Sequence, residues 1–95
     1  MSEAELIKSI REVLMITFHE RDLNIDISNL DMDTDLIEQL AINSMIAIEI
    51  LVRIENVLDI EFDDENLSLE NIKTIRTIVE LTKQLVKGYI KSVYN

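Results

Sequence analysis

Three stretches of the 95-residue chain carry interior-type residues at steps of three and four, the spacing that places them on one face of an α-helix. The positions are Leu6, Ile7, Ile10, Val13, Leu14, Thr17 and Phe18 in the first stretch, Ile50, Leu51, Ile54 and Leu58 in the second, and Ile75, Ile78, Val79, Leu81, Leu85 and Val86 in the last. Such faces need neighbours to cover them, so the pattern predicts helices packed around a core.

The composition also favours an all-α fold. The chain has no proline, a single glycine at position 88, few aromatic residues and few strand-like alternations. Its length suits one domain with a modest core, and we expect residues 1–95 to form that single domain. Residues 88–95 are expected to form a fraying helical tail.

Capping residues indicate where the first two helices begin. Ser2 and Glu5 fit a capping box, so the first helix is expected to start near Ser2 and to end near residues 19–21. Asn43 and Ser44 are good N-cap residues, because a short side-chain oxygen accepts hydrogen bonds from the first free backbone N–H groups. The second helix is therefore expected to run from about Asn43 to Leu58.

The later part of the chain is expected to hold two more helices. A short third helix is expected around Asp64–Leu69, capped by Asp63 or Asp64. The last helix is expected to begin between residues 71 and 74. Its apolar series continues to Val86, and Tyr89, Ile90 and Val93 extend the pattern beyond Gly88. Ile60 and Phe62, in the preceding link, are expected to point inward.

Residues 22–42 form a long connection rich in Asp, Asn and Ser, which favour turns. Interspersed apolar residues are expected to pin this connection to the helices. Residues 36–40 are expected to form a helical turn. Ile25 and Ile27 alternate with polar residues, so a short strand is also allowed by the pattern, although it has no partner.

The net charge of −10 is concentrated in the middle of the chain. Residues 22–70 hold 14 acidic residues against the single base Arg53, whereas residues 71–95 hold five bases against one acid. An acidic middle repels nucleic acid and anionic lipid and favours basic protein partners. Acidic residues that only keep the domain soluble are the alternative interpretation.

Several kinds of chemistry lack the residues that they need. There is no cysteine, and therefore no disulfide, thiolate metal site or thiol nucleophile in the chain itself. No apolar run is long enough to span a membrane, and the acidic N-terminus does not resemble a signal peptide, so a cytoplasmic protein is expected.

The start of the second helix is the strongest candidate site. Unpaired N–H groups and the helix dipole favour an anion at a helix N-terminus, so a phosphate esterified to Ser44 would be well placed there. Asn43-Ser44-Met45, ahead of an amphipathic helix in a small acidic chain, resembles the Asp-Ser-Leu signature of the acyl carrier protein family. The resemblance covers most of the chain.

The resemblance implies a four-helix bundle with a long first loop and a short third helix. It implies that a separate phosphopantetheinyl transferase moves 4'-phosphopantetheine from coenzyme A to Ser44, and that an acyl or aminoacyl group rides on the thiol of that arm. By the same resemblance the protein is a free-standing, monomeric carrier without catalytic activity that docks loading and processing enzymes with basic surfaces. The docking residues so implied are Asn43, Met45, Glu49, Val52 and Glu55.

Three residues depart from the family pattern. Asn43 replaces the usual Asp, which keeps the capping ability but removes a negative charge that a transferase could contact. Met45 for Leu is nearly isosteric. Ala41 stands where many members have Gly, and it is expected to stiffen the approach to Ser44.

Two other functions are alternatives to the carrier hypothesis. A carrier-like interaction module that is never modified is the main alternative, and a small hydrolase would need His19 beside Ser44. Residues 31–35 imitate the start of an EF-hand loop, but Leu36 and Ile42 stand where that loop needs Gly and a bidentate Glu. No metal site is therefore expected. Replacing Ser44 by Ala distinguishes these two hypotheses, because it would abolish the function of a carrier and change little in an interaction module.

Overall fold

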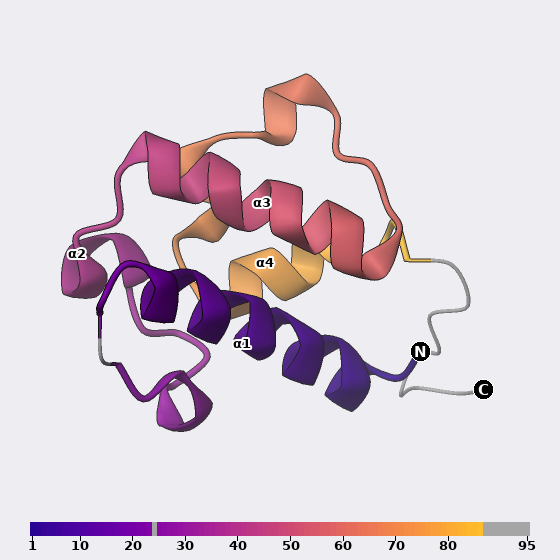
Figure 1. The fold of residues 1–95 in the computed structure, drawn as a ribbon. Coiled ribbons are helices and arrows are strands. Elements are labelled where there is room, and N and C mark those ends of the chain that lie inside the picture. Colours follow the sequence, from indigo (N-terminus) through magenta and orange to yellow (C-terminus); the bar gives the residue numbers. More distant parts are fainter. Residues whose placement is uncertain (24, 87–95) are drawn as a thin grey trace.

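The computed structural model describes residues 1–23 and 25–86. Its elements, shown in Figure 1, are α1 (Glu3–Glu20), η1 (Ile27–Asn29), α2 (Leu36–Leu40), α3 (Ser44–Leu58), η2 (Asp64–Asn66), η3 (Leu69–Ile72) and α4 (Ile75–Thr82), where η marks a 3₁₀ helix. The regular elements of the described residues are thus helical, which confirms the all-α prediction.

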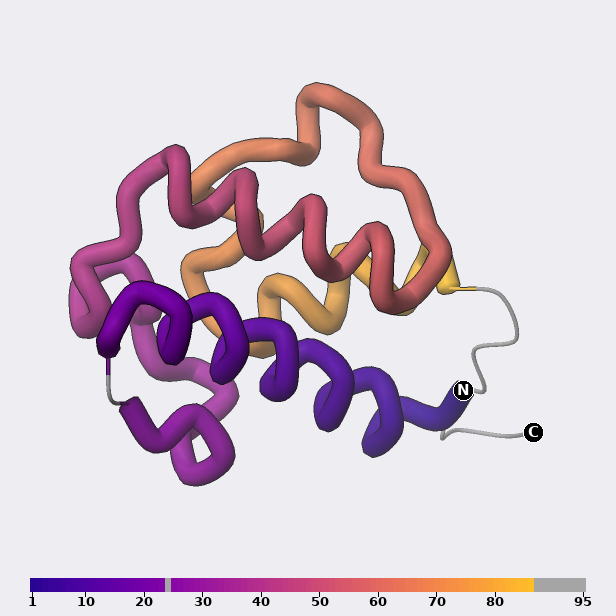
Figure 2. The backbone as a smooth tube through the Cα atoms, in the orientation of Figure 1, coloured from indigo at the N-terminus to yellow at the C-terminus, as the bar shows by residue number. Residues whose placement is uncertain are grey.

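Helices α1 and α3 lie side by side and run in opposite directions, and α4 lies behind them and contacts α1 (Figures 1 and 2). Their inward faces meet in a core that the connections complete. Its largest fully buried side chains are Leu6, Ile10, Leu14 and Phe18 from α1, Ile50, Leu51 and Ile54 from α3, Ile75 and Ile78 from α4, and Ile27, Leu36 and Ile72 from the connections. The predicted faces therefore form most of the core. Ile7, Leu58, Leu81 and Val86 are only partly buried at its edge, and Leu85, which follows the end of α4, is exposed.

The predicted capping box starts α1. The Glu5 N–H donates to Ser2 Oγ over 3.2 Å, and the Ser2 N–H donates to Glu5 Oε1 over 3.1 Å. These hydrogen bonds, above all the one from the Ser2 backbone, lower the pKa of the Glu5 carboxyl. Ser2 therefore caps α1 as the sequence predicted.

Side chains of the helices hold the long connection between α1 and α3. Arg11 reaches from α1 and donates through Nη1 to the Ile27 and Leu30 carbonyl oxygens, over 2.7 and 2.9 Å. Ile27 is buried and begins η1, and Ile25 is partly buried against the core. The short strand that the alternation of Ile25 and Ile27 allowed is therefore wrong, because burial of Ile27 and the bonds from Arg11 favour a tight turn.

The helical turn predicted within this connection is confirmed as α2. Asp35 caps it by accepting a hydrogen bond from the Glu38 N–H over 3.0 Å. The Leu36 N–H donates to the Lys73 carbonyl over 2.7 Å, which ties α2 to the segment ahead of α4. Leu36 is fully buried beneath this contact. The last stretch before Ser44 is thus anchored to the core.

The predicted third helix, Asp64–Leu69, is wrong as one helix. The chain forms η2 and η3 instead, and neither has a side-chain hydrogen bond at its N-cap. Polar Asp, Asn and Ser side chains compete for backbone groups in this segment, and Asn71 Nδ2 donates to the Asn66 carbonyl over 2.6 Å. Short 3₁₀ turns satisfy such a segment better than a continuous α-helix.

The last helix begins as predicted and ends earlier. Thr74 caps α4 by accepting from the Thr77 N–H over 2.9 Å. The helix ends at Thr82, not at Val86, and residues 83–85 continue as hydrogen-bonded turns. The buried Thr82 hydroxyl donates to the Ile78 and Val79 carbonyls, a local bond that bends helices. The predicted tail of residues 88–95 lies outside the described residues.

The link after α3 turns inward as expected. Phe62 is buried and Ile60 packs partly against the core. Among the helices of residues 1–23 and 25–86, none is long and apolar enough to cross a membrane. The same residues contain no group of three or more His, Cys, Asp or Glu side chains placed to hold a metal ion.

Candidate functional site

Ser44 is the first residue of α3, and Asn43 is its N-cap. Asn43 Oδ1 accepts a hydrogen bond from the Ile46 N–H over 2.9 Å, and the Asn43 carbonyl accepts from the Ala47 N–H over 3.0 Å. Asn43, Ser44 and Met45 are exposed, whereas Ile46 and Ala47 are buried. The serine is therefore held on a well-formed helix start with its side chain accessible from solvent.

The backbone at this point suits a negatively charged group. In the first turn of a helix the leading N–H groups have no intrahelical acceptor. The side chain of Asn43 accepts a hydrogen bond from one of these groups, the N–H of Ile46. The N–H groups of Ser44 and Met45 remain directed out of the helix end, where the helix dipole also favours an anion. A phosphodiester on Ser44 Oγ therefore fits this end of α3.

The approach to Ser44 contains a strained residue. Ala41 ends α2 in the left-handed conformation, with φ 52° and ψ 42°. A side chain with a Cβ is disfavoured in this conformation, whereas glycine adopts it freely. Glycine, which many members of the family that this chain resembles have at position 41, would relieve this strain, so Ala41 has a structural cost.

An apolar strip follows Ser44 along the exposed face of α3. Met45, Ile48 and Val52 are 73%, 45% and 40% exposed. Their spacing of three and four residues places them on one side of the helix. We call these three residues the apolar strip. Met45 and Val52 were predicted as docking residues. Ile48 was missed, although the same spacing would have identified it.

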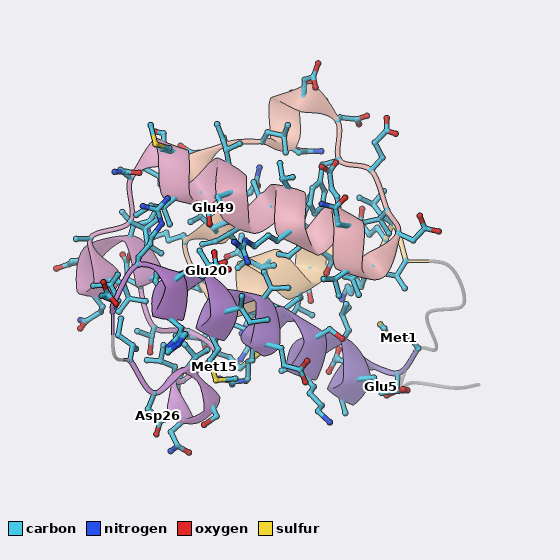
Figure 3. The ribbon with its side chains drawn as sticks, in the orientation of Figure 1. Met1, Glu5, Met15, Glu20, Asp26 and Glu49 are labelled. Carbon is cyan, nitrogen blue, oxygen red and sulfur yellow. The ribbon has the colours of Figure 1, made fainter. Side chains whose placement is uncertain are left out.

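Glu49, beside the apolar strip, is engaged within the chain. Its Oε1 lies 2.6 Å from Arg21 Nη2, and its Oε2 lies 3.3 Å from Arg53 Nη2. Arg53 also donates to Glu20, and Figure 3 shows Glu20 and Glu49 where α1 faces α3. Two carboxylates and two guanidinium groups therefore form one network between the helices. We call these four residues the ion-pair network.

Glu55, the other carboxylate of α3, is engaged as well. Its Oε2 accepts a hydrogen bond from the Phe62 N–H over 2.7 Å in a partly buried contact. The Glu55 carbonyl accepts from the Ile60 N–H over 3.1 Å. Glu55 thus holds the chain that returns from the end of α3 to the core, which sequence reasoning did not indicate.

His19 and Ser44 lie toward the same end of the molecule, since α1 ends where α3 begins (Figure 1). Both residues are exposed, and no side-chain hydrogen bond joins them in the described part of the chain. The ion pairs between the two helices at this end join Arg21 to Glu49 and Arg53 to Glu20. The arrangement does not provide the serine–histidine contact that a hydrolase requires.

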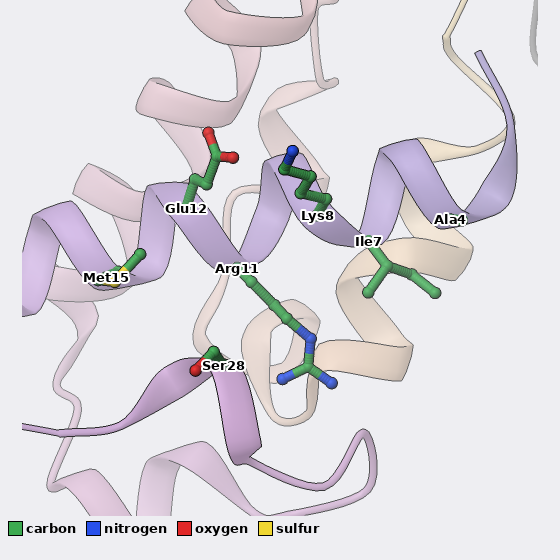
Figure 4. A pocket seen from close by; sticks show the side chains of 7 residues that line it. All are labelled: Ala4, Ile7, Lys8, Arg11, Glu12, Met15 and Ser28. Atoms are coloured by element: carbon green, nitrogen blue, oxygen red, sulfur yellow. The ribbon is translucent and has the colours of Figure 1, made fainter.

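A shallow hollow of 380 Å³ lies along α1 on the side of η1. Figure 4 shows Arg11 extending from α1 on the side where Ser28 lies, with Ile7 and Met15 along the helix. Ala4, Lys8 and Glu12 complete the lining. Ser44 is not among these residues, so the candidate site is an exposed helix end and not part of this hollow.

Comparison with known proteins agrees with this geometry. Residues 4–82 match the family model described as "Phosphopantetheine attachment site". The chain belongs to the acyl carrier protein family. It is 33% identical over 72 residues to an acyl carrier protein of Phytoplasma mali (strain AT), an alignment that covers 76% of this chain and 83% of that protein. No solved structure matches it.

Membership of the acyl carrier protein family defines the general function. The protein carries acyl groups on 4'-phosphopantetheine. Family members are carriers, and they work with the transferases and biosynthetic enzymes that modify and load them. The all-α fold of the described residues, with a long connection before α3, agrees with this family, although two 3₁₀ turns stand where a short third helix was predicted.

Proposed function

We propose that Ser44 is the residue to which 4'-phosphopantetheine is attached. The observation that carries this proposal is the exposure of Ser44 at the first position of α3, with the leading N–H groups of the helix beside it. Ser44 also lies within the matched residues 4–82. Asn43 supports the same role, because its amide oxygen caps α3 as an Asp carboxylate would.

The chain's own residues position the group and perform no covalent chemistry on the cargo. In the reaction catalysed by a phosphopantetheinyl transferase, Ser44 Oγ attacks the phosphorus that carries the arm in coenzyme A and loses its proton. The pyrophosphate bond of coenzyme A breaks, adenosine 3',5'-bisphosphate leaves, and a phosphodiester joins the arm to the serine. 4'-Phosphopantetheine then supplies the thiol on which an acyl or aminoacyl group is held as a thioester, a thiol that this cysteine-free chain lacks. In this proposal the protein is a carrier and not an enzyme.

The proposed docking surface is the start and exposed side of α3, with Asn43, Met45, Glu49, Val52 and Glu55 as its residues. Its position supports this role, because any enzyme that acts at Ser44 must cover the first turns of the same helix. The acidic middle of the chain favours loading and processing enzymes with basic surfaces. We propose further that one chain folds as a single domain and works as a monomer in the cytoplasm.

Intact mass measurement tests the assignment of Ser44. The wild-type protein and the Ser44→Ala variant are incubated with coenzyme A and a broad-specificity phosphopantetheinyl transferase. Ser28→Ala serves as the matched control, because Ser28 is an exposed serine on η1. We expect wild type and Ser28→Ala to gain one phosphopantetheinyl group and Ser44→Ala to gain none.

Two results would overturn the proposal. Modification of Ser44→Ala would move the attachment to another hydroxyl. An unmodified wild type would favour the alternative of a carrier-like interaction module that is never modified, with Asn43 as the first residue to change to Asp. Circular dichroism of each variant ensures that a loss of modification does not reflect unfolding.

A further inference from the structure

The shallow hollow along α1 is lined by one stripe of that helix. Ile7, Arg11 and Met15 follow one another at steps of four residues, so they lie on the same side of α1, next to η1. Ile7 packs partly against the core, whereas Met15 is 46% exposed. The volume of the hollow, 380 Å³, lies within the range of small-molecule sites in proteins. Such sites combine an apolar lining with a few polar groups in fixed positions.

Arg11 is the polar group within this stripe, and its charge has no acidic partner in the part of the chain that the structure describes. Arg21 and Arg53 belong to the ion-pair network, and Arg76 pairs with Asp33. No described carboxylate lies within ion-pair distance of Arg11, although the chain has 19 acidic residues. Taking a cation partly out of water without a counter-ion is unfavourable. A bound anion would compensate for that loss.

The guanidinium of Arg11 is held in place by one of its nitrogens. Nη1 donates to the Ile27 and Leu30 carbonyl oxygens over 2.7 and 2.9 Å, which restricts the orientation of the whole planar group. A guanidinium has five N–H donors, so those of Nε and Nη2 remain. Neither of these nitrogens donates to another described residue. A fixed fork of N–H groups suits the paired oxygens of a carboxylate or a phosphate.

The other charged groups around the hollow do not neutralise Arg11. Lys8 and Glu12 line its rim, and Figure 4 shows both side chains extending away from the Arg11 guanidinium. Because they are one cation and one anion, their effects on a charged ligand largely cancel. Asp26, next to the hollow in sequence, accepts a hydrogen bond from the Ser28 hydroxyl over 2.7 Å and forms no ion pair with Arg11. An anion at Arg11 therefore meets a cation that is still unpaired.

We propose that this hollow binds a small amphipathic anion. Its carboxylate or phosphate accepts hydrogen bonds from the remaining N–H groups of Arg11, and its apolar chain covers Ile7 and Met15. Hydrogen bonds between charged groups supply the specificity, and the removal of apolar surface from water supplies further affinity. Ser44 does not line the hollow, so this site is separate from the proposed attachment site and does not depend on the role of that serine.

NMR titration of the unmodified, ¹⁵N-labelled full chain tests the charge requirement. The probes are octanoate and octyl phosphate, which carry the proposed chemistry, and octanol, which has the same apolar chain without the charge. We expect at least one anion to bind with a Kd on the order of 1 mM, and octanol to bind at least about fivefold more weakly. The anion that binds more tightly distinguishes a carboxylate from a phosphate ligand. The largest shifts are expected at Ile7, Arg11 and Met15, including the Nε–H signal of Arg11.

A matched pair of variants tests the location. Met15→Glu places a carboxylate in the hollow, where it competes with the ligand for Arg11. Ile16→Glu is the control, because Ile16 is the next residue of α1, is 50% exposed and does not line the hollow. Both variants change the net charge equally at an exposed position. Arg11 itself is left unchanged, since it also holds the first connection.

We expect Met15→Glu to raise the Kd of the tighter anion about tenfold and Ile16→Glu to raise it less than about twofold. Equal effects of the two variants would overturn the location. Octanol binding as tightly as both anions would overturn the role of Arg11, and the absence of saturable binding of either anion up to about 10 mM would overturn the site itself. None of these results bears on Ser44, whose modification is measured separately.

Discussion

The two long connections of the chain are similar in composition but are held in different ways. The first, residues 21–43, is anchored by cationic side chains from the helices that it crosses, Arg11 of α1 and Arg76 of α4. The second, residues 59–74, is anchored by Glu55 at its start and by Asn71 within it. Both are acidic, so composition alone does not distinguish them.

The difference affects how Ser44 is presented. The first connection leads directly to Ser44, and its anchors come from residues that are distant in sequence. Arg11 is 16 residues from Ile27, and Arg76 is 43 residues from Asp33. The position of the serine therefore depends on the packing of α1 and α4, whereas the side-chain hydrogen bonds that hold the second connection join residues seven and five positions apart.

The largest effect is expected from the anchor in α1. Arg11→Ala removes both hydrogen bonds to the Ile27 and Leu30 carbonyls and leaves these groups without that donor. We expect the free energy of unfolding to fall by about 2 kcal/mol, because hydrogen bonds to a charged group are stronger than neutral ones. Urea denaturation followed by circular dichroism measures this change.

Arg21→Ala is the matched control for the Arg11 experiment. Arg21 is the C-cap of α1, and its side chain donates to the partly exposed Glu49 carboxylate and not to backbone carbonyls. Glu49 keeps Arg53 as a second partner when Arg21 is removed. We expect a loss of less than about 0.5 kcal/mol from this variant. If Arg11→Ala were no more harmful than Arg21→Ala, the first connection would have no special dependence on its distant anchor.

The contrast between the connections also explains which parts of the structure could be predicted. Residues only a few positions apart determine the capping box of Ser2 and Glu5 and the start of α3 at Ser44. The sequence alone therefore predicts both features. The role of Arg11 depends on contacts with residues 16 and 19 positions away, and that of Glu55 on a contact beyond the end of its own helix, which no helical pattern reveals.

The same distinction between local pattern and tertiary contact applies to the candidate site. The position of Ser44 at the start of α3 could be predicted from its neighbours, since helix capping depends on adjacent residues. The engagement of Glu49 could not, because Arg21 becomes its partner only when α1 packs against α3. The continuous third helix was wrong for a related reason, since the bonds of Asn71 within the folded link favour 3₁₀ turns.

A smaller effect, in the opposite direction, is expected at two of the three residues with positive φ, which are Asp22, Ala41 and Asp59. Ala41 has φ 52° in the first connection, and Asp59 has φ 54° at the start of the second. Ala41→Gly is expected to stabilise the protein by about 0.5–1 kcal/mol, because glycine adopts this conformation without the strain of a Cβ. Asp59→Gly is expected to gain less, since Asp tolerates the left-handed region better than Ala.

Thermal unfolding of the two glycine variants measures this difference. Equal gains at both positions would show that the strain at residue 41 is no greater than at residue 59. A loss of stability in Ala41→Gly would show that the freedom gained by the unfolded chain outweighs the strain relieved in the folded one. Equal gains would therefore remove one distinction between the connections. A loss of stability in Ala41→Gly would mean that alanine at position 41 stabilises the protein more than glycine does.

The smallest effect is expected from the exposed anchor in α4. Arg76 Nε donates to Asp33 Oδ1 over 2.6 Å, and this side-chain hydrogen bond lowers the pKa of the Asp33 carboxyl. A carboxyl with a lowered pKa in the folded state stabilises the protein above its pKa in the unfolded chain, and this stabilisation is lost as pH falls through the folded value. The contribution is therefore complete near neutrality and absent in strong acid.

Comparing wild type with Asp33→Asn isolates this contribution. We expect the small stability advantage of the wild type to be constant from about pH 7 to about pH 5 and to vanish by about pH 2. In the Arg76→Gln background the same Asp33→Asn change should have no effect that depends on pH in this range. A pH dependence that persists without Arg76 would show that another group lowers the pKa of Asp33. Arg11 would then be the main arginine anchor of the first connection.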